Sequence, residues 1–342
     1  MFESIDPLAS STDSTFPRLL GDIGGTNARF GWQRQVNAPI EAVMVLPCAD
    51  HTSLKNAIET YLKSQHLPKP AWGAFGIANP VTGDAMAMTN HHWAFSISEL
   101  RQSLGLSRLV FLNDFTALAL ALPSLPSRSK RLVDPNGTTR VGVDAPIGLI
   151  GPGTGLGVSG LIPHQGRWLP ISGEGGHVTL AATNRLEFEV FQLLQKRHGH
   201  VSAERVLSGP GLIDLFHALA EIKGEGGFEV TSAAQVLTMA SSISGNELTP
   251  GAVLTAQETL HLFCAFLGST AGNLALTLGA RGGIYLGGGI VPRLTDWLEK
   301  SDFRHRFEAK GRFQAYLKEI PVWIIDSPVS PALQGAAAAL SA

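Results

Sequence analysis

A strand–glycine turn–strand unit occurs twice in this chain, and it limits the fold more than any other feature. The first copy reads LLGDIGGTNARFGWQ, residues 19–33, and the second reads LIGPGTGLGVSGLI, residues 149–162. Their turns begin at Gly21 and Gly151, 130 positions apart. Two similar β-rich openings at that distance indicate an internal duplication, with one copy in each half of the chain.

Strand and helix patterns alternate along the rest of the chain. Strands are expected at 42–46, 71–78, 108–112, 146–150, 283–289 and 322–325, and helices at 53–65, 115–122, 186–196, 211–223, 232–242, 254–278 and 331–341. This alternation is typical of an α/β protein rather than an all-α or all-β one.

Length and local composition predict two lobes. A chain of 342 residues is long enough for two domains, each with its own core. Residues 1–17 are rich in Ser and Thr and lack periodicity, so we expect a mobile tail there. Pro, Ser and charged residues interrupt every periodicity over 122–137, which predicts a linker.

Charge and cysteine content exclude several classes of protein. The 26 basic and 28 acidic residues contain no Lys/Arg block of the kind that binds nucleic acid, so we expect no nucleic-acid partner. Cys48 and Cys264 are the only cysteines, which excludes a disulfide framework and a cysteine zinc site.

The N-terminus has no basic residue before Arg18 and no apolar segment, unlike a signal or transit peptide. No run reaches about 18 apolar residues, so we expect a cytoplasmic protein that does not enter a membrane.

The two glycine turns are candidates for binding phosphate. Backbone N–H groups in such a turn can converge on phosphate oxygens, and Thr26 and Thr154 add hydroxyl donors. Asp22 would repel a phosphate unless a cation lies between them, which favours a Mg²⁺-nucleotide. The alternative is two ordinary hairpins. A P-loop motif does not occur, and the GxGxxG string that starts at Gly155 is not followed by a helix, so we exclude a dinucleotide fold.

Several polar residues lie where an α/β protein places a ligand. Asn113 and Asp114 end an apolar strand and begin a helix, although Asp114 could equally be a helix cap. Glu174 and His177 lie on the glycine-rich segment SGEGGH, which suits recognition of hydroxyl groups. Glu204 follows near a helix start, where a salt bridge with Arg205 is the alternative.

Three consecutive glycines, Gly287, Gly288 and Gly289, follow an apolar strand. Without side chains, this turn would let a flat group lie against the backbone. A sharp strand-to-helix turn explains the same string, and the two interpretations stay open.

Together these segments resemble the bacterial-type glucokinase family, within the sugar kinase and actin-like ATPase superfamily. The resemblance rests on LLGDIGGTNARF, FGIANPVTGDAMAMTNHHWAFS, FLNDFTALALALP, GPGTGLGV, GEGGH, VSAERVLSGPG and YLGGGI, which follow the family's order over roughly residues 18–340.

The resemblance implies a fold and a reaction. The fold is α/β, of the two-lobed ribonuclease H-like type, with a mixed five-stranded sheet and flanking helices in each lobe and a cleft between them. The small lobe would span 18–124 plus about 321–342, and the large lobe 125–320. The reaction is transfer of the γ-phosphoryl group of Mg²⁺-ATP to the 6-hydroxyl of D-glucose, the first step of glycolysis. A homodimer is also implied.

The family's motifs also assign roles to residues. Asp114 matches the general base, and it matches a sugar contact together with Asn113, Glu174, His177 and Glu204. The nucleotide-binding segments match the first phosphate loop at Gly21, Asp22, Ile23, Gly24, Gly25 and Thr26, the second at Gly153, Thr154 and Gly155, and the adenosine turn at Gly287, Gly288 and Gly289.

Two alternatives compete with this assignment. The ROK sugar kinases and repressors resemble it, but they carry a zinc-binding cysteine cluster where LAATNRLEFEVF follows His177 here. We therefore expect no metal site in the protein itself, and Mg²⁺ that is carried by ATP, with Asp22 as a possible contact. A non-catalytic sugar or nucleotide sensor on the same fold is the second hypothesis. A repressor form would need a DNA-reading module, for which the 17 residues before the first strand are too few.

Overall fold

A computed structural model of the chain describes residues 14–88, 91–134, 137–225, 229–242, 249–327 and 331–341. The chain divides into two compact units, each with its own sheet and its own core. Unit 1 consists of Met1–Ser124 and Val329–Ala342, and unit 2 of Leu125–Pro328.

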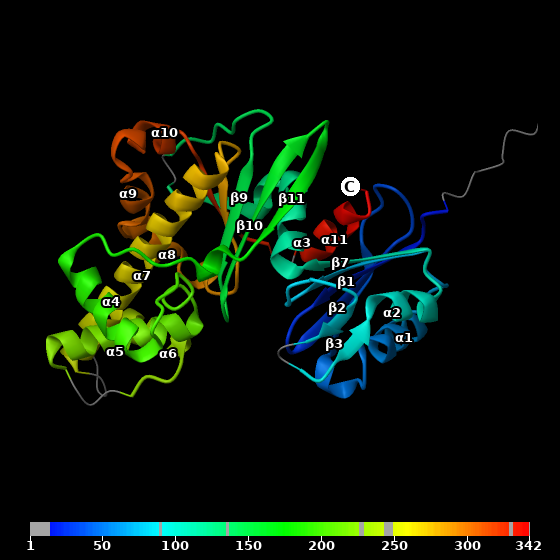
Figure 1. Ribbon diagram of the computed structural model, residues 1–342, viewed down its shortest axis with the longest axis horizontal. Helices are drawn as coiled ribbons and strands as arrows, with labels where there is room; N and C mark the ends of the chain where they lie inside the picture. The colour runs from blue at the N-terminus through cyan, green and yellow to red at the C-terminus, as the bar shows by residue number, and fades with distance from the viewer. Residues whose placement is uncertain are drawn as a thin grey trace, which may run out of the picture. The chain divides into compact units, whose positions relative to one another are not determined.

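Unit 1 is built on a five-stranded mixed sheet with the order β3-β2-β1-β4-β7 (Figure 1). The strands are β1 (Arg18–Ile23), β2 (Asn27–Gln33), β3 (Glu41–Pro47), β4 (Trp72–Ile77) and β7 (Arg108–Asn113), with a separate hairpin of β5 (Ala85–Ala87) and β6 (Ala94–Ser96). Strands β1, β4 and β7 run parallel, and their register aligns Ile23 with Ile77 and Ile77 with Asn113. The carboxyl ends of these three strands therefore share one edge of the sheet.

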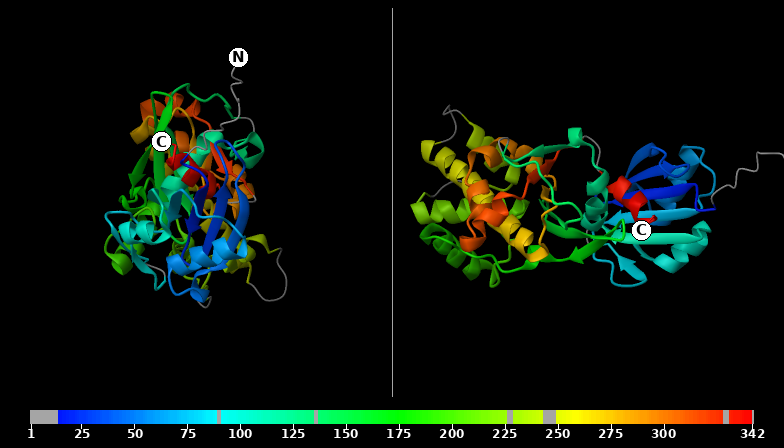
Figure 2. Two further views of the ribbon diagram at one scale, coloured as in Figure 1. Left: turned by 90° about the vertical axis from the view of Figure 1, so that its right-hand side faces the viewer. Right: turned by 90° about the horizontal axis from the view of Figure 1, so that it is seen from above.

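Helices cover both faces of this sheet. They are α1 (Leu54–Ser64), α2 (Ile97–Leu104), α3 (Asp114–Ala121) and α11 (Ala332–Ala339), with short 3₁₀ turns η1 (Cys48–Asp50) and η2 (Leu122–Ser124). Successive strand residues point to opposite faces. Leu19 therefore joins the core under α1 and α2, whereas Leu20 packs with Leu333 of α11. The C-terminal helix α11, drawn in red, lies beside the N-terminal strands of this unit (Figure 2).

Unit 2 contains a six-stranded sheet with the order β11-β10-β9-β12-β13-β8. The strands are β8 (Lys130–Leu132), β9 (Ile147–Pro152), β10 (Leu156–His164), β11 (Arg167–Gly173), β12 (Ile284–Leu286) and β13 (Val322–Ile325). Five strands of this sheet, in the order β11-β10-β9-β12-β13, repeat the pairing of the unit 1 sheet. Strand β10 is antiparallel to β11 and to β9, β9 is parallel to β12, and β12 is parallel to β13. The duplication expected from the two glycine turns is confirmed at the level of topology.

The helices of unit 2 pack around one long helix, α7 (Figure 1). The helices are α4 (Arg185–His198), α5 (Gly209–Lys223), α6 (Ala233–Ser241), α7 (Pro250–Leu278), α8 (Thr295–Lys300), α9 (Phe303–Glu308) and α10 (Gln314–Lys318), with 3₁₀ turns η3 (Ser127–Ser129), η4 (Gly175–His177), η5 (Val291–Arg293) and η6 (Gly311–Phe313). The 29 residues of α7 are long and apolar enough to cross a membrane, but 78% of the most apolar window is buried inside the protein. Because α5, α6 and α9 all pack against α7, it is the core helix of this unit.

The structure corrects three expectations about boundaries. The segment assigned to the small lobe from about 321 begins in unit 2 instead, because β13 pairs with β12 and β8 in the second sheet. That sheet has a sixth strand, β8, within the expected linker 122–137, of which residues 135–136 lie outside the described part. Residues 1–13 of the expected tail 1–17 also lie outside the part of the chain that the structure describes. The tail does not extend to residue 17, because the Pro17 carbonyl accepts a hydrogen bond from Ala71 N at 2.8 Å.

Candidate active site

The first glycine turn lies at the shared edge of unit 1. Gly21 and Ile23 are buried within β1, while Gly24, Gly25 and Thr26 form the more exposed turn before β2. A Cβ atom on Gly21 would lie 2.1 Å from the Phe75 ring, so this glycine is required by packing rather than by a ligand. The part of the motif that can reach a phosphate is therefore Gly24 to Thr26.

Cys48 contacts this turn through its backbone N–H and its thiol. Its backbone N–H donates to the Thr26 carbonyl at 2.8 Å, and its Sγ lies 3.7 Å from the Gly24 carbonyl oxygen. Burial raises the pKa of the Cys48 thiol, so it stays a neutral donor at pH 7. No local pattern in the sequence predicts this contact, since the two residues are 24 positions apart.

Asp22 forms an ion pair with Arg29, a residue that the sequence analysis missed. The two residues face each other across β1 and β2, with 3.0 Å between Arg29 Nη1 and Asp22 Oδ2. Both line a pocket of about 280 Å³ together with Gly24, Thr26 and Asn27. The hairpin itself carries the signal: a turn centred on Gly25 and Thr26 pairs position 22 with position 29. This pocket thus offers a cation and a carboxylate beside exposed backbone.

Asp114 is the first residue of α3, at the same edge as the glycine turn. The helix cap is Asn113, whose Oδ1 accepts from the backbone N–H groups of Phe115 at 3.0 Å and Thr116 at 3.3 Å. Asp114 Oδ1 accepts from Phe115 N at 2.8 Å. Because Asn113 caps the helix, capping alone does not explain an Asp at position 114.

The environment of Asp114 changes its proton affinity. Burial, together with the negative charge of Asp22, raises the pKa of Asp114 to about 6, although hydrogen bonds from Phe115 and Asn113 oppose the shift. A pKa shift at Asp114 was not expected from its residue type or its neighbours in the sequence. A carboxylate with a pKa near 6 is still mostly ionised at pH 7, and it binds a proton more readily than an ordinary Asp.

The second glycine turn lies in unit 2, and Glu204 is bonded to it. Glu204 Oε2 accepts from Leu156 N at 2.9 Å, and a Cβ atom on Gly155 would lie 2.4 Å from this same oxygen. The carbonyl of Gly153 accepts from Gly209 N, at the start of α5, at 2.8 Å. Gly155 is therefore a glycine because Glu204 approaches so closely, and Thr154 stays exposed at the tip of the turn.

Unit 2 brings Glu174, His177 and Glu204 together. Glu204 N donates to the Gly176 carbonyl at 2.9 Å, and His177 Nδ1 lies 4.0 Å from Glu204 Oε1. The side chains of Glu174 and His177 are exposed, and that of Glu204 is one-third exposed at 32%. The partners of Glu204 are thus Leu156 and His177, not Arg205, and its second oxygen faces the glycine-rich segment.

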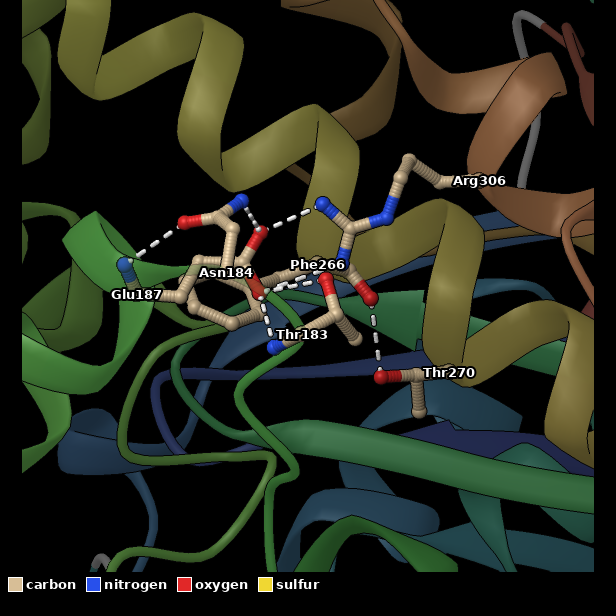
Figure 3. Close-up of polar contacts among 6 residues, drawn as sticks. All are labelled: Thr183, Asn184, Glu187, Phe266, Thr270 and Arg306. Carbon is tan, nitrogen blue, oxygen red and sulfur yellow. Dashed lines mark hydrogen bonds and ion pairs between the residues drawn. The ribbon is translucent and has the colours of Figure 1, made fainter.

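A buried carboxylate anchors the segment that follows His177 (Figure 3). Glu187 is fully buried at the start of α4, and both of its oxygens pair with the Arg306 guanidinium of α9. It also accepts from Thr183 N at 2.7 Å and from Asn184 Nδ2 at 2.9 Å. Burial alone would raise its pKa, but the bonds from Arg306 and Thr183 outweigh burial and lower it. This network fixes the chain between the sugar-binding candidates and α4.

The three-glycine turn follows β12, beside the second glycine turn. Gly287 N donates to the Ile150 carbonyl at 2.9 Å. Gly288 has a positive φ of 82°, and a Cβ atom there would lie 2.3 Å from the Pro152 carbonyl oxygen, so position 288 requires glycine on both grounds. The parallel pairing of β9 with β12 thus places the two turns at one edge of the unit 2 sheet.

A pocket of about 510 Å³ lies just after this turn. It is lined by α6 residues Ala234, Leu237, Thr238 and Ser241, by Ser242, and by Arg293 and Trp297. This hollow is open to solvent, and its lining combines the Trp297 ring and the Leu237 side chain with hydroxyl groups and the Arg293 guanidinium, which can contact the flat and the polar parts of a small organic ligand. No sequence motif marks this pocket, because its walls come from two stretches far apart in the chain, residues 234–242 and 293–297.

A resident metal centre is not found in the part of the chain that the structure describes. No group of three or more His, Cys, Asp or Glu side chains there could hold an ion. Asp22 is one carboxylate in a phosphate-sized pocket, which fits Mg²⁺ that is held mainly by nucleotide phosphates.

Comparisons with known proteins identify the family of the chain. The family model described as Glucokinase matches residues 19–342. A curated glucokinase of Aromatoleum aromaticum is 50% identical over 334 residues, with 97% of each chain covered. A glucokinase of Chromobacterium violaceum is 49% identical, with 98% of this chain and 92% of the relative covered. The crystal structure of a glucokinase from an Antarctic psychrotroph matches with a TM-score of 0.85 at 37% identity, covering 95% of this chain and 98% of the other.

Proposed function

The chain belongs to the glucokinase family and catalyses phosphorylation of D-glucose by ATP at the 6-hydroxyl, and we propose that Asp114 is the general base of this reaction. The observation that carries the proposal is the place of Asp114 at the carboxyl edge of the unit 1 sheet, the same edge as the first glycine turn, with β4 between β7 and β1. There the Asp114 carboxylate can accept the proton of the sugar hydroxyl as that oxygen attacks the γ-phosphorus, while the bond from the γ-phosphorus to the β,γ-bridging oxygen of ATP breaks.

We propose that Glu174, His177 and Glu204 hold the sugar, with Asn113 and Asp114 as further contacts. Carboxylates accept from hydroxyl groups, and an imidazole can donate or accept. The bond from Glu204 Oε2 to Leu156 N fixes the direction of its carboxylate. A sugar contact at Glu204 would thus be coupled mechanically to the second glycine turn.

The nucleotide is ATP, and we propose that the two glycine turns bind its phosphates. Gly24, Gly25 and Thr26 would supply donors from unit 1, and Gly153, Thr154 and Gly155 from unit 2. Mg²⁺ bound with ATP would neutralise phosphate charge, with Asp22 as its one protein carboxylate. The positive charge of Arg29 supports phosphate binding in the same pocket, because phosphoryl transfer depends mainly on positioning and charge neutralisation.

We propose that the adenosine part of ATP binds along the turn Gly287 to Gly289 and in the pocket of α6, η5 and α8. Arg293 lies four positions after the turn and lines this pocket with Trp297. The buried α7 and the family relationship further support an enzyme that works in the cytoplasm, and we propose a homodimer on the family resemblance.

A coupled assay for glucose 6-phosphate tests the activity itself. The enzyme should form this product from glucose and Mg²⁺-ATP over many catalytic turnovers. The competing hypothesis is a non-catalytic sugar or nucleotide sensor on the same fold, and no turnover with any hexose at millimolar concentration would favour it.

The substitution Thr238→Trp tests the nucleotide pocket. Thr238 is exposed on α6 and lines the pocket, so an indole there would occupy the space proposed for the base. We expect the KM for ATP to rise roughly 10-fold, equivalent to about 1.4 kcal/mol of lost binding, while the KM for glucose stays the same. Asp296→Trp is the matched control, since Asp296 is exposed on α8 outside the pocket lining. An unchanged KM for ATP in Thr238→Trp would mean that the adenine ring of ATP binds elsewhere.

A further inference from the structure

The first turn of α3 rests on a strand position that has no side chain. Gly76 of β4 is buried beneath this helix, and a Cβ atom there would lie 3.0 Å from Ala117 Cβ and 3.6 Å from Asp114 Cα. A separation of 3.0 Å between two carbon atoms is well inside their optimal contact distance of roughly 3.5–4.0 Å, so the helix would have to move by a few tenths of an ångström. The 3.6 Å separation from Asp114 is an ordinary contact. Space, and not backbone conformation, therefore selects glycine at this position.

The same helix is confined on a second side. A Cβ atom on Gly335 of α11 would lie 1.6 Å from the Ala117 carbonyl oxygen, so the backbones of α3 and α11 are in direct contact. Ala117 is thus enclosed by the sheet at Gly76 and by α11 at Gly335. Because a packed interior does not absorb an added methyl group freely, any displacement passes to the start of α3, where Asp114 lies.

We propose that Gly76 is a positioning residue for catalysis, which sets the height of the first turn of α3 above the sheet and hence the place of the Asp114 carboxylate. The proposal rests on Asp114 being the general base. Misplacement of a reacting group by about 1 Å can cost roughly 100-fold in rate, and a shift of tenths of an ångström costs less. Gly76 itself touches no substrate.

Gly76→Ala, Ala117→Gly and the double variant form the test. We expect Gly76→Ala to lower kcat roughly 10-fold with the KM for ATP unchanged. Ala117→Gly removes the atom that the new methyl group would meet, so the double variant should recover the kcat of Ala117→Gly. Ala117→Gly alone should keep nearly full kcat and lower the melting temperature, because glycine lowers helix propensity.

Thermal unfolding separates positioning from simple loss of stability. The glycine that Ala117→Gly places in α3 destabilises this helix. If Gly76→Ala acted only by loosening the fold, the double variant would therefore be less active than Gly76→Ala alone. Gly73→Ala is the matched control on the same strand. Its Cβ would lie 3.1 Å from the end of the flexible Leu109 side chain, away from α3, and kcat should not change.

The outcomes distinguish this inference from the proposal about Asp114. Full kcat in Gly76→Ala, or a double variant no more active than Gly76→Ala, would overturn the role of Gly76. Adding Gly76→Ala to Asp114→Asn should cost no further kcat, because the base is already absent; a further 10-fold loss there would also contradict it. If Asp114→Asn itself keeps full kcat, it is the assignment of the base that fails.

Discussion

Galactose should be phosphorylated with a kcat/KM about 10⁴-fold lower than that of glucose. The two sugars differ only in the direction of the 4-hydroxyl, so size alone cannot separate them. A site that binds hydroxyl groups through buried or fixed polar groups leaves those groups unpaired when one hydroxyl is inverted. The Glu204 carboxylate is held by Leu156 N and faces His177, which limits its freedom to follow a displaced hydroxyl.

Steady-state kinetics with both sugars at saturating ATP measure this discrimination. Fructose should also be a poor substrate. Glu174→Gln and Glu204→Gln serve as variants of the same site, and they should raise the KM for glucose with smaller losses in kcat. Comparable kcat/KM for glucose and galactose in the wild-type enzyme would refute the assignment of Glu174, His177 and Glu204 to the sugar.

Asp114→Asn should lower kcat by about 10² to 10⁴, the usual contribution of a general base, while glucose still binds. Asparagine keeps the shape of the side chain and the oxygen that accepts from Phe115 N, but it cannot take a proton from the sugar hydroxyl. Rapid-quench kinetics should locate the loss in the chemical step, and equilibrium titration should find glucose affinity little changed. Near-normal kcat in this variant would place the base elsewhere.

The same substitution should make the protein more stable at pH 7.5. The pKa of Asp114 is about 6 in the folded protein and 3.8 in its ordinary state, so the folded protein binds this proton more tightly than the unfolded chain. Ionisation of Asp114 therefore costs stability as the pH rises from about 4 through 6. Asparagine removes that cost, and we expect a gain on the order of 1–3 kcal/mol in the free energy of unfolding. The gain should shrink as the pH falls below 6.

Elements with long, regular apolar patterns were predictable from the sequence. The helix expected at 53–65 is α1, Leu54–Ser64, where Ser53 caps the helix and the buried residues recur at helical spacing. The second half was less predictable, because α8, α9 and α10 have only five or six residues each, too few for a periodic pattern. Strand β8 has three residues and depends on distant packing, with Lys130 over the Trp323 ring at 4.9 Å.

The candidate site was predictable to the same extent: local patterns indicate single residues, whereas contacts between distant segments leave no pattern in the sequence. Local motifs identified Asp114, Glu204 and the glycine turns, and local pairing in the first hairpin could also have identified Arg29. The bond between Glu204 and Leu156 spans 48 positions, and no pattern in the sequence predicts it. The pKa of Asp114 depends on burial under neighbouring elements and on the charge of Asp22, which residue identity does not reveal.

The pH dependence of kcat/KM for glucose tests the assignment of Asp114 most directly, because this ratio reports the ionisation of the enzyme form to which glucose binds. In the wild-type enzyme, kcat/KM at saturating Mg²⁺-ATP should rise with pH, reach half its maximum near pH 6 and stay level above, as Asp114 ionises. In Asp114→Asn the residual activity should lose this acidic limb. A wild-type profile that is flat between about pH 5 and 8, or a limb near pH 6 that persists in Asp114→Asn, would contradict the assignment of Asp114 as the base.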